Sequence, residues 1–230
     1  MAIDEALLRA GRVATLRIYA WAPAGLSMGY FQPCAPFERV EGEHVLVRRP
    51  TGGGAIYHDR EITFALTADA TLLPWGIRAT YELLHEACAR ALLEVGVSAR
   101  IAEPGTHPPP GRRTAPLWCF DRPAAGDVVD PDGRKLVGSA QRRVKRPRPR
   151  VLHHGSIPLV RPRPAPFGGD VASQTDPDVV RAPLREALVR EIAAALGATP
   201  RAGDLEPDEL ELSARLEERR YADASFLRRR

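Results

Sequence analysis

The sequence predicts an α+β protein in which a mostly antiparallel or mixed β-sheet packs against helices. Three observations support this fold class. Apolar and polar residues alternate in short runs through the first two thirds of the chain, as half-buried strands require. Stripes with helical spacing dominate the last third, and no internal repeat is visible. Strands followed by helices are typical of an α+β protein.

The length and composition favour one soluble domain. The 230 residues predict a single unit over 1–230, with a core over 1–160 and a helical part over 180–225. Apolar residues make up 44% of the chain and charged residues 27%, as in ordinary globular proteins. No bilayer-spanning run and no signal peptide is visible, so we expect no membrane partner and a cytoplasmic location. The net charge of +4 is mild, so we expect no nucleic-acid partner.

One helix and four strands are predicted in the first third. Residues 2–10 carry acidic side chains early and apolar ones on one face, which predicts a helix. Apolar and polar residues alternate over 13–31, and a Pro-Ala-Gly turn interrupts them, which predicts two strands. Residues 44–49 and 62–66 predict a third and a fourth strand, with three glycines between them.

The middle of the chain carries the strongest helical pattern. An apolar stripe over 78–95, followed by a glycine, predicts a helix. Five prolines and two glycines over 104–116 predict an exposed loop, after which ordered structure resumes at 117–120. Residues 134–144 and 151–160 predict two further strands.

Two helices and a basic turn complete the predicted elements. Residues 183–196 form one apolar stripe, with Pro183 at the start and a glycine after the end. A more acidic helix is predicted over 207–219. Between the last two strands, the basic, proline-stiffened segment 145–150 either steers an acidic partner or is a solvated loop.

Three consecutive glycines, Gly52, Gly53 and Gly54, follow the third predicted strand. Without Cβ atoms, such a bend lets a ligand lie against bare backbone and lets N–H groups converge on an oxygen. A flexible hairpin loop is the alternative, because neither a dinucleotide-binding pattern nor a Walker lysine is present. Arg49 and His58, which bracket the glycines, favour a ligand site.

A second small-residue segment combines Gly138, Ser139 and Ala140 with Lys135. Small side chains imply close packing against that strand, by a ligand or by a crossing helix. Lys135 is one of only two lysines among 33 cationic side chains. A compact ammonium suits a position against a sulfur or a carbonyl oxygen, and a solvated edge charge is the alternative.

Adjacent histidines, His153 and His154, precede Gly155 on the last predicted strand. Neighbouring side chains on a strand point to opposite faces, so the pair cannot easily bind one ion, and we predict no metal site. His153 and His58 are candidate polar contacts at a ligand site, with a structural role as the alternative for each.

The three cysteines have no CxxC spacing, so neither a disulfide framework nor a zinc site is indicated. Cys88 lies on the apolar stripe of its predicted helix and is expected in the core. Cys34 has no obvious basic partner nearby. Cys119, between Trp118 and Phe120, is the nucleophile candidate, and a buried strand residue is the alternative.

Several segments taken together resemble the biotin/lipoate protein ligase and transferase family. They cover most of residues 1–160 in the family's order: Met1-Ala-Ile-Asp-Glu-Ala-Leu-Leu8, Gly29-Tyr-Phe-Gln32, Arg48 to Asp59, Cys119-Phe120, Gly133-Arg-Lys to Gln141, and His153-His-Gly155. The resemblance implies the fold shared by biotin ligases and class II aminoacyl-tRNA synthetases.

Within that family the chain is most similar to the lipoate-ligase-like octanoyltransferases. His58-Asp-Arg-Glu-Ile-Thr63 resembles their His-Asp-x-Glu-x-Thr segment, where ATP-dependent ligases prefer His-Asp-x-Gly-Asn. The resemblance implies that octanoyl passes from acyl carrier protein to Cys119 as a thioester. It then passes to a lysine of a lipoyl-accepting domain, of the glycine cleavage H protein or of a dehydrogenase E2, in lipoate biosynthesis. Lys135 favours the attacking thiolate.

The resemblance also implies the residues that contact substrate. They are Arg49, Gly52, Gly53, Gly54, His58, Gly138, Ser139, Ala140, His153 and Gly155. No cofactor is implied, because thioester exchange and amide formation from a thioester need no ATP. The alternatives are an ATP- and magnesium-dependent lipoate-protein ligase or a lipoyl amidotransferase, and an inactive carrier- or nucleic-acid-binding protein with the same fold.

Overall fold

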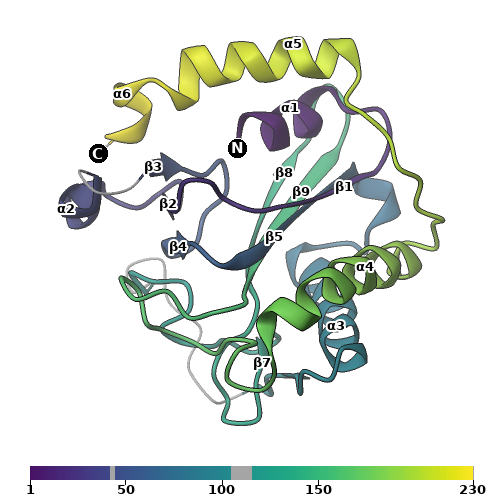
Figure 1. The fold of residues 1–230 in the computed structure, drawn as a ribbon. Helices are drawn as coiled ribbons and strands as arrows, with labels where there is room; N and C mark the ends of the chain where they lie inside the picture. Colours follow the sequence, from purple (N-terminus) through teal and green to yellow (C-terminus); the bar gives the residue numbers. More distant parts are fainter. Residues whose placement is uncertain (42–44, 105–115, 230) are drawn as a thin grey trace.

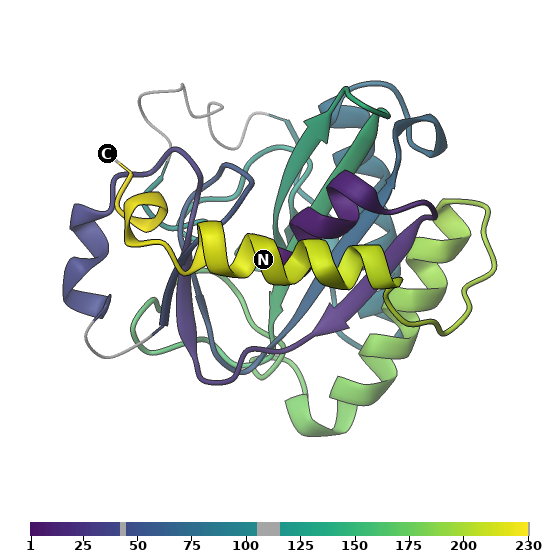
Figure 2. The same ribbon diagram turned by 90° about the horizontal axis from the view of Figure 1, so that it is seen from above.

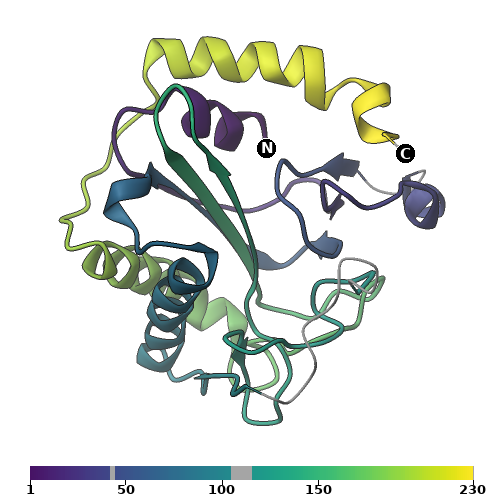
Figure 3. The same ribbon diagram turned by 180° about the vertical axis from the view of Figure 1, so that it is seen from behind.

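A four-stranded antiparallel sheet lies at the centre of the computed structural model, which describes residues 1–41, 45–104 and 116–229 (Figure 1). Its strand order is β1-β5-β9-β8. The strands are β1 (Thr15–Tyr19), β5 (Glu61–Asp69), β9 (Arg150–Pro158) and β8 (Gly138–Val144). Seen from behind in Figure 3, the β8–β9 hairpin forms the near edge of this sheet.

A smaller sheet has the order β3-β2-β4 and carries the glycine loop. Strand β2 (Gly25–Met28) runs parallel to β3 (Val45–Arg48) and antiparallel to β4 (Ile56–His58). Strands β6 (Arg100–Ile101) and β7 (Val128–Val129) form a separate antiparallel pair. The α+β class with mostly antiparallel, partly mixed sheets is therefore confirmed.

Helices cover both faces of the four-stranded sheet (Figures 1 and 2). Helices α3 (Ile77–Glu94) and α4 (Pro177–Ala195) pack together on one face, and α1 (Ala2–Ala10) and α5 (Pro207–Leu216) lie on the other. The shorter helical segments are 35–37, α2 (Glu38–Glu41), 70–72, 217–221 and α6 (Ala224–Leu227). No helix among the described residues is long and apolar enough to cross a membrane.

The alternation of β5 and β9 gives the sheet two different faces. Phe64 and Leu66 of β5 join the main core with α3 and α4. Ala65 and Leu152 face the other way and pack against Leu8 of α1. Each fully buried large apolar side chain contributes about 1.5–3 kcal/mol, so this alternation fixes which face of the sheet each helix covers.

Two sequence-based predictions differ from the structure. Pro183 does not begin the helix: the Asp176 side chain accepts a hydrogen bond from the Asp178 N–H, Pro177 lies in the first turn, and Pro183 is inside α4. An acidic cap followed by proline is a stronger start signal than proline alone. Strand β4 was not predicted, because three residues are too few to show alternation. The predicted proline-rich loop lies mostly outside the described residues.

Candidate active site

The Cys119 loop is attached to the residue that follows the three glycines. The Ala55 N–H donates to the Leu117 carbonyl oxygen (2.8 Å), and the Cys119 N–H donates to the Ala55 carbonyl oxygen (2.8 Å). A Cβ at Gly54 would lie 2.8 Å from the Cys119 nitrogen, so only glycine permits this approach. The glycine loop therefore sets the position of Cys119.

The Cys119 sulfur lies against the first residue of β8. A Cβ at Gly138 would lie 3.1 Å from Sγ and 2.8 Å from the Phe120 ring. Cys119 itself is 8% exposed. Any side chain at position 138 would thus take space beside the sulfur, which explains the small residue that the sequence places there.

Lys135 is buried in the segment between β7 and β8 and forms an ion pair with Asp127. The distance from Nζ to Asp127 Oδ2 is 2.9 Å. Burial alone lowers the pKa of Lys135, but the charges of Cys119 and Asp127 raise that pKa above its ordinary value. Lys135 is therefore an ammonium group that interacts electrostatically with Cys119.

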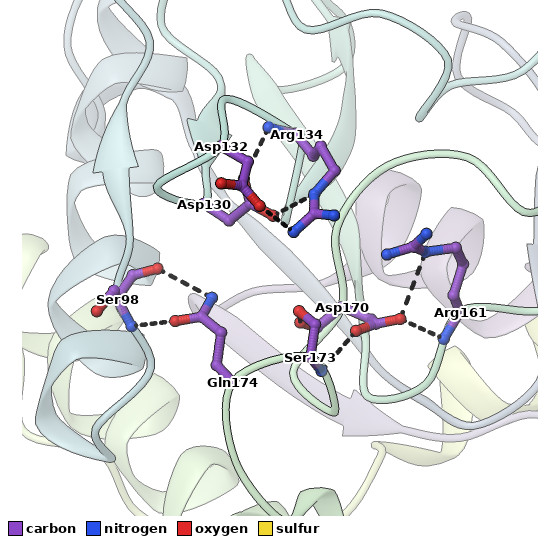
Figure 4. Close-up of polar contacts among 8 residues, drawn as sticks. All are labelled: Ser98, Asp130, Asp132, Arg134, Arg161, Asp170, Ser173 and Gln174. Atoms are coloured by element: carbon purple, nitrogen blue, oxygen red, sulfur yellow. Dashed lines mark hydrogen bonds and ion pairs between the residues drawn. The ribbon is translucent and has the colours of Figure 1, made fainter.

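Figure 4 shows polar contacts of Asp130 and of Asp170 in two loops that bracket Lys135 in the sequence. The Asp130 carboxylate accepts hydrogen bonds from the backbone N–H (2.8 Å) and the Nε (2.7 Å) of Arg134. The Asp170 carboxylate accepts from two backbone N–H groups near it. Beside it, the Gly169 N–H donates to the Lys135 carbonyl oxygen (2.9 Å). The backbone of Lys135 is thus fixed from both sides.

A small pocket lies on the α1 face of the sheet, next to Gly138. It is lined by Met1, Arg49, Ile56, His58, Thr63, Gly138, Ser139, Ala140, His154, Gly155 and Ser156. Six predicted substrate contacts are in this lining: Arg49, His58, Gly138, Ser139, Ala140 and Gly155. Gly52, Gly53, Gly54 and His153 are not in it. The Cys119 sulfur lies beside the lining at its Gly138 end, and Lys135 interacts electrostatically with Cys119.

Arg49 holds the glycine loop as well as lining the pocket. Its Nη1 donates to the carbonyl oxygen (2.8 Å) and hydroxyl (3.0 Å) of Ser27. Its Nη2 donates to the carbonyl oxygens of Gly52 (2.9 Å) and Gly54 (2.8 Å). Because both nitrogens are used on the protein, Arg49 shapes the pocket wall.

The His58-to-Thr63 segment forms a polar network next to Arg49, because His58 and Arg49 both hydrogen-bond to the Ser27 hydroxyl. His58 hydrogen-bonds through Nε2 to the Ser27 hydroxyl (2.6 Å) and through Nδ1 to Glu61 (2.6 Å). Glu61 also accepts hydrogen bonds from the hydroxyls of Thr63 and Ser156. These groups satisfy one another, so the wall tolerates an apolar ligand.

His153, a predicted substrate contact, is not in the lining of this pocket. Its ring lies on the face of the sheet that α3 covers, 4.8 Å from the Tyr81 ring and 6.0 Å from the His85 ring. His154, on the other face, lines the pocket and shares a 2.6 Å hydrogen bond with the Thr51 hydroxyl. The alternation of strand side chains requires one histidine on each face, but only the structure shows which face holds the pocket.

Sequence reasoning missed three groups around Lys135: Asp127, Tyr81 and His85. Burial raises the pKa of Tyr81 to about 12, with Lys135 and Cys119 among the charges that act on it. His85 Nδ1 donates to the Gly126 carbonyl oxygen (2.7 Å), and its Nε2 accepts from the Ser139 hydroxyl (2.6 Å). The helical spacing of Tyr81 and His85 predicted only a buried helix face. Asp127, an acid before a short strand, matched no pattern that predicts a functional site.

A buried cysteine that interacts electrostatically with an ammonium group, next to a mostly apolar pocket, is an arrangement that can carry an acyl group. The chain matches the lipoyl protein ligase A/B catalytic domain over residues 1–192, and it belongs to that family.

Curated relatives with this domain are octanoyltransferases. The chain is 36% identical to Octanoyltransferase LipM of Kyrpidia tusciae, over 97% of the chain and 92% of that protein. It is 43% identical to Octanoyltransferase LipM of Moorella thermoacetica, over 69% of the chain but 60% of that protein. The relationship confirms an acyltransferase enzyme of the octanoyl-transferring kind in protein lipoylation.

Solved structures show the same fold at lower identity. Protein Ta0514 of T. acidophilum, with bound lipoic acid, has a TM-score of 0.79 at 23% identity and covers 100% of this chain and 92% of its own. Lipoate-protein ligase A bound with ATP has a TM-score of 0.75 at 23% identity, over 99% of this chain and 92% of its own. These values establish the architecture alone.

Proposed function

We propose that the enzyme transfers octanoyl from acyl carrier protein to a lysine of a lipoyl-accepting domain through a thioester on Cys119, without ATP or a metal. The Cys119 thiolate attacks the donor thioester, a new C–S bond forms, the donor C–S bond breaks, and the carrier leaves as a thiolate that takes a proton from solvent. The acceptor amine then attacks the acyl-enzyme, a C–N bond forms, the C–S bond breaks and the amine proton passes to solvent.

The observation that carries this proposal is the placement of Cys119 beside Gly138, at the end of the pocket and in the field of Lys135. An ammonium group there favours the thiolate and then stabilises the oxyanion of the tetrahedral intermediate. For the acceptor, an archaeal lipoate protein ligase of the same fold is described together with its E2 lipoyl domain. A cytoplasmic location stays a prediction.

Intact-mass measurement of the protein mixed with octanoyl-acyl carrier protein tests the first step. Wild type should gain roughly 126 Da, the mass of one octanoyl group on a thiol. Cys119→Ala should gain nothing. Cys88→Ala is the matched control and should gain the same mass, because burial raises the pKa of Cys88 to about 12 and keeps that thiol inert.

The second step is tested by adding an acceptor domain to the acyl-enzyme. Loss of the adduct from Cys119 should match its gain on one acceptor lysine. If Cys119→Ala instead modifies the acceptor with lipoate, ATP and magnesium, the ligase alternative is correct and the thioester route is wrong.

A further inference from the structure

The Asp127 carboxylate is fixed independently of the sulfur. Its Oδ2 accepts one hydrogen bond from Lys135 Nζ (2.9 Å) and another from the Ala124 N–H (2.7 Å). Both side chains of the pair are about one tenth exposed, at 9% for Lys135 and 10% for Asp127. The carboxylate therefore stays in place whatever the state of Cys119.

Burial and three neighbouring groups act on the charge of Lys135. Burial opposes the ammonium form, whereas the charges of Cys119 and Asp127 favour it, and Tyr81 adds a smaller contribution in the same direction. His85 faces the same region, but burial lowers its pKa, so at neutral pH it carries no charge there. The two anions that oppose the desolvation of Lys135 are thus the thiolate and the Asp127 carboxylate.

The proposed reaction removes one of those anions. When Cys119 becomes a thioester, its sulfur is neutral, while the burial of Lys135 is unchanged. We propose that Asp127 is a positioning residue that keeps Lys135 protonated in the acyl-enzyme, so that the ammonium is present for the second transfer step. This inference rests on the proposed function, because it concerns the acylated state of Cys119.

The ammonium is needed again when the acceptor amine attacks. Negative charge develops on the carbonyl oxygen as the C–N bond forms, and the sulfur leaves as a thiolate when the C–S bond breaks. A neutral Lys135 would stabilise neither anion. A Lys135 that lost its proton on acylation would therefore support the first half-reaction and fail in the second.

The two lysines of the chain make the charge of Lys135 directly measurable. Protein with isotope-labelled lysine gives two side-chain NMR signals, and Lys145→Arg identifies the one from Lys135. Cys119→Ser supplies a neutral group at position 119. In that background Lys135 should stay protonated past its ordinary pKa of 10.5, and adding Asp127→Asn should bring its pKa below 10.5. Identical titrations in the two proteins would overturn the inference.

Kinetics of the purified acyl-enzyme give the second readout. Asparagine keeps an oxygen for both hydrogen bonds and removes only the charge. The ratio of the Asp127→Asn rate to the wild-type rate of transfer to an acceptor should fall about tenfold for each pH unit above the lowered pKa that the NMR titration gives Lys135 with Asp127→Asn. Asp132→Asn, an exposed acid paired with Arg134 in the adjoining turn, should give a constant ratio.

The two hypotheses fail separately. If the wild-type protein never forms an octanoyl adduct, the proposed function is wrong. The NMR titration still decides whether Asp127 raises the pKa of Lys135. An adduct that forms normally, combined with a pH-independent ratio for Asp127→Asn, leaves the proposed function standing and refutes the role of Asp127.

Discussion

Gly138 is the residue at which the smallest change should have the largest effect on chemistry. A Cβ at this position would lie 3.1 Å from the Cys119 sulfur and 2.8 Å from the Phe120 ring, so its absence leaves room for both. Gly138→Ala should push the sulfur away from Lys135 and slow acylation by about 100-fold, because small misplacements of reacting groups are costly. The rate of octanoyl adduct formation, followed by intact mass, measures this loss.

The control for that substitution is Gly203→Ala, which meets no neighbouring atom within 4 Å. It should acylate at the wild-type rate. Overpacking at position 138 should cost about 1–3 kcal/mol of unfolding free energy, so Gly138→Ala should still fold. A folded Gly138→Ala protein with a normal acylation rate would show that the sulfur does not depend on this contact.

His154 should make stability depend on pH. Burial is the main cause that lowers its pKa from 6.5 to about 3, so the native chain rejects a proton that the unfolded chain binds. Stability should therefore decrease as pH falls from 6.5 toward 3, by up to about 1.4 kcal/mol per pH unit for this group. His154→Gln should show a shallower decrease in urea unfolding between about pH 7 and about pH 5. If the unfolding free energies of wild type and His154→Gln decreased in parallel with pH, His154 would not cause the pH dependence.

The turn of the β8–β9 hairpin carries exposed cations at Lys145, Arg146 and Arg148. Because carrier and lipoyl domains are typically acidic, this element should steer their approach. Arg146→Glu with Arg148→Glu should raise KM for the carrier several-fold at low salt and leave kcat unchanged, and added salt should remove the difference.

The same charge reversal on another element is the control for docking at the hairpin. Arg181 and Arg185 lie exposed on α4, on the other face of the sheet. Arg181→Glu with Arg185→Glu should leave KM near the wild-type value. Equal effects from the two double variants would mean that net charge, and not the hairpin, governs association.

Elements with a long periodic pattern were predictable, and short or cap-determined ones were not. The stripe over 78–95 matches α3 (Ile77–Glu94) because eighteen residues repeat the helical period. Strand β4 is only Ile56–His58 and is defined by its pairing with β2 rather than by its own pattern. The start of α4 was misplaced, because its cap at Asp176 outweighs Pro183.

The site was predictable in part, because motifs name residues but not the faces they occupy. Motifs named Cys119 and Lys135, and in the structure these two residues interact electrostatically. Asp127 did not, because nothing in the order of the chain shows that its carboxylate meets Lys135. The sequence analysis named His153 and not His154 as a contact. Which of the two lines the pocket depends on the face of β9 that α3 covers, and the sequence around them does not show that face. Contacts between distant segments, such as these, leave no pattern in the neighbouring sequence.

Arg48 connects segments from distant parts of the chain. It directly precedes Arg49, which lines the pocket. It is 1% exposed, and its guanidinium donates to the carbonyl oxygens of Gly29, Tyr30, Gln32, Phe226, Leu227 and Arg229. Removing it leaves one buried and several part-buried carbonyl groups without this donor. Arg48→Met should therefore cost about 3 kcal/mol or more of unfolding free energy in urea denaturation.

Two further variants decide whether this cost reflects the particular geometry of the Arg48 contacts. Arg48→Lys should fail to restore stability, because one ammonium group cannot reach both sets of carbonyl oxygens. Arg12→Met removes an exposed ion pair with Asp208, at 69% and 48% exposure, and should cost less than about 1 kcal/mol. If Arg48→Met and Arg12→Met were equally mild, the C-terminal segment would be held by apolar packing. If Arg48→Met instead destabilises the protein strongly, acylation of Cys119 should slow as well, because Arg48 directly precedes the segment that positions the cysteine loop.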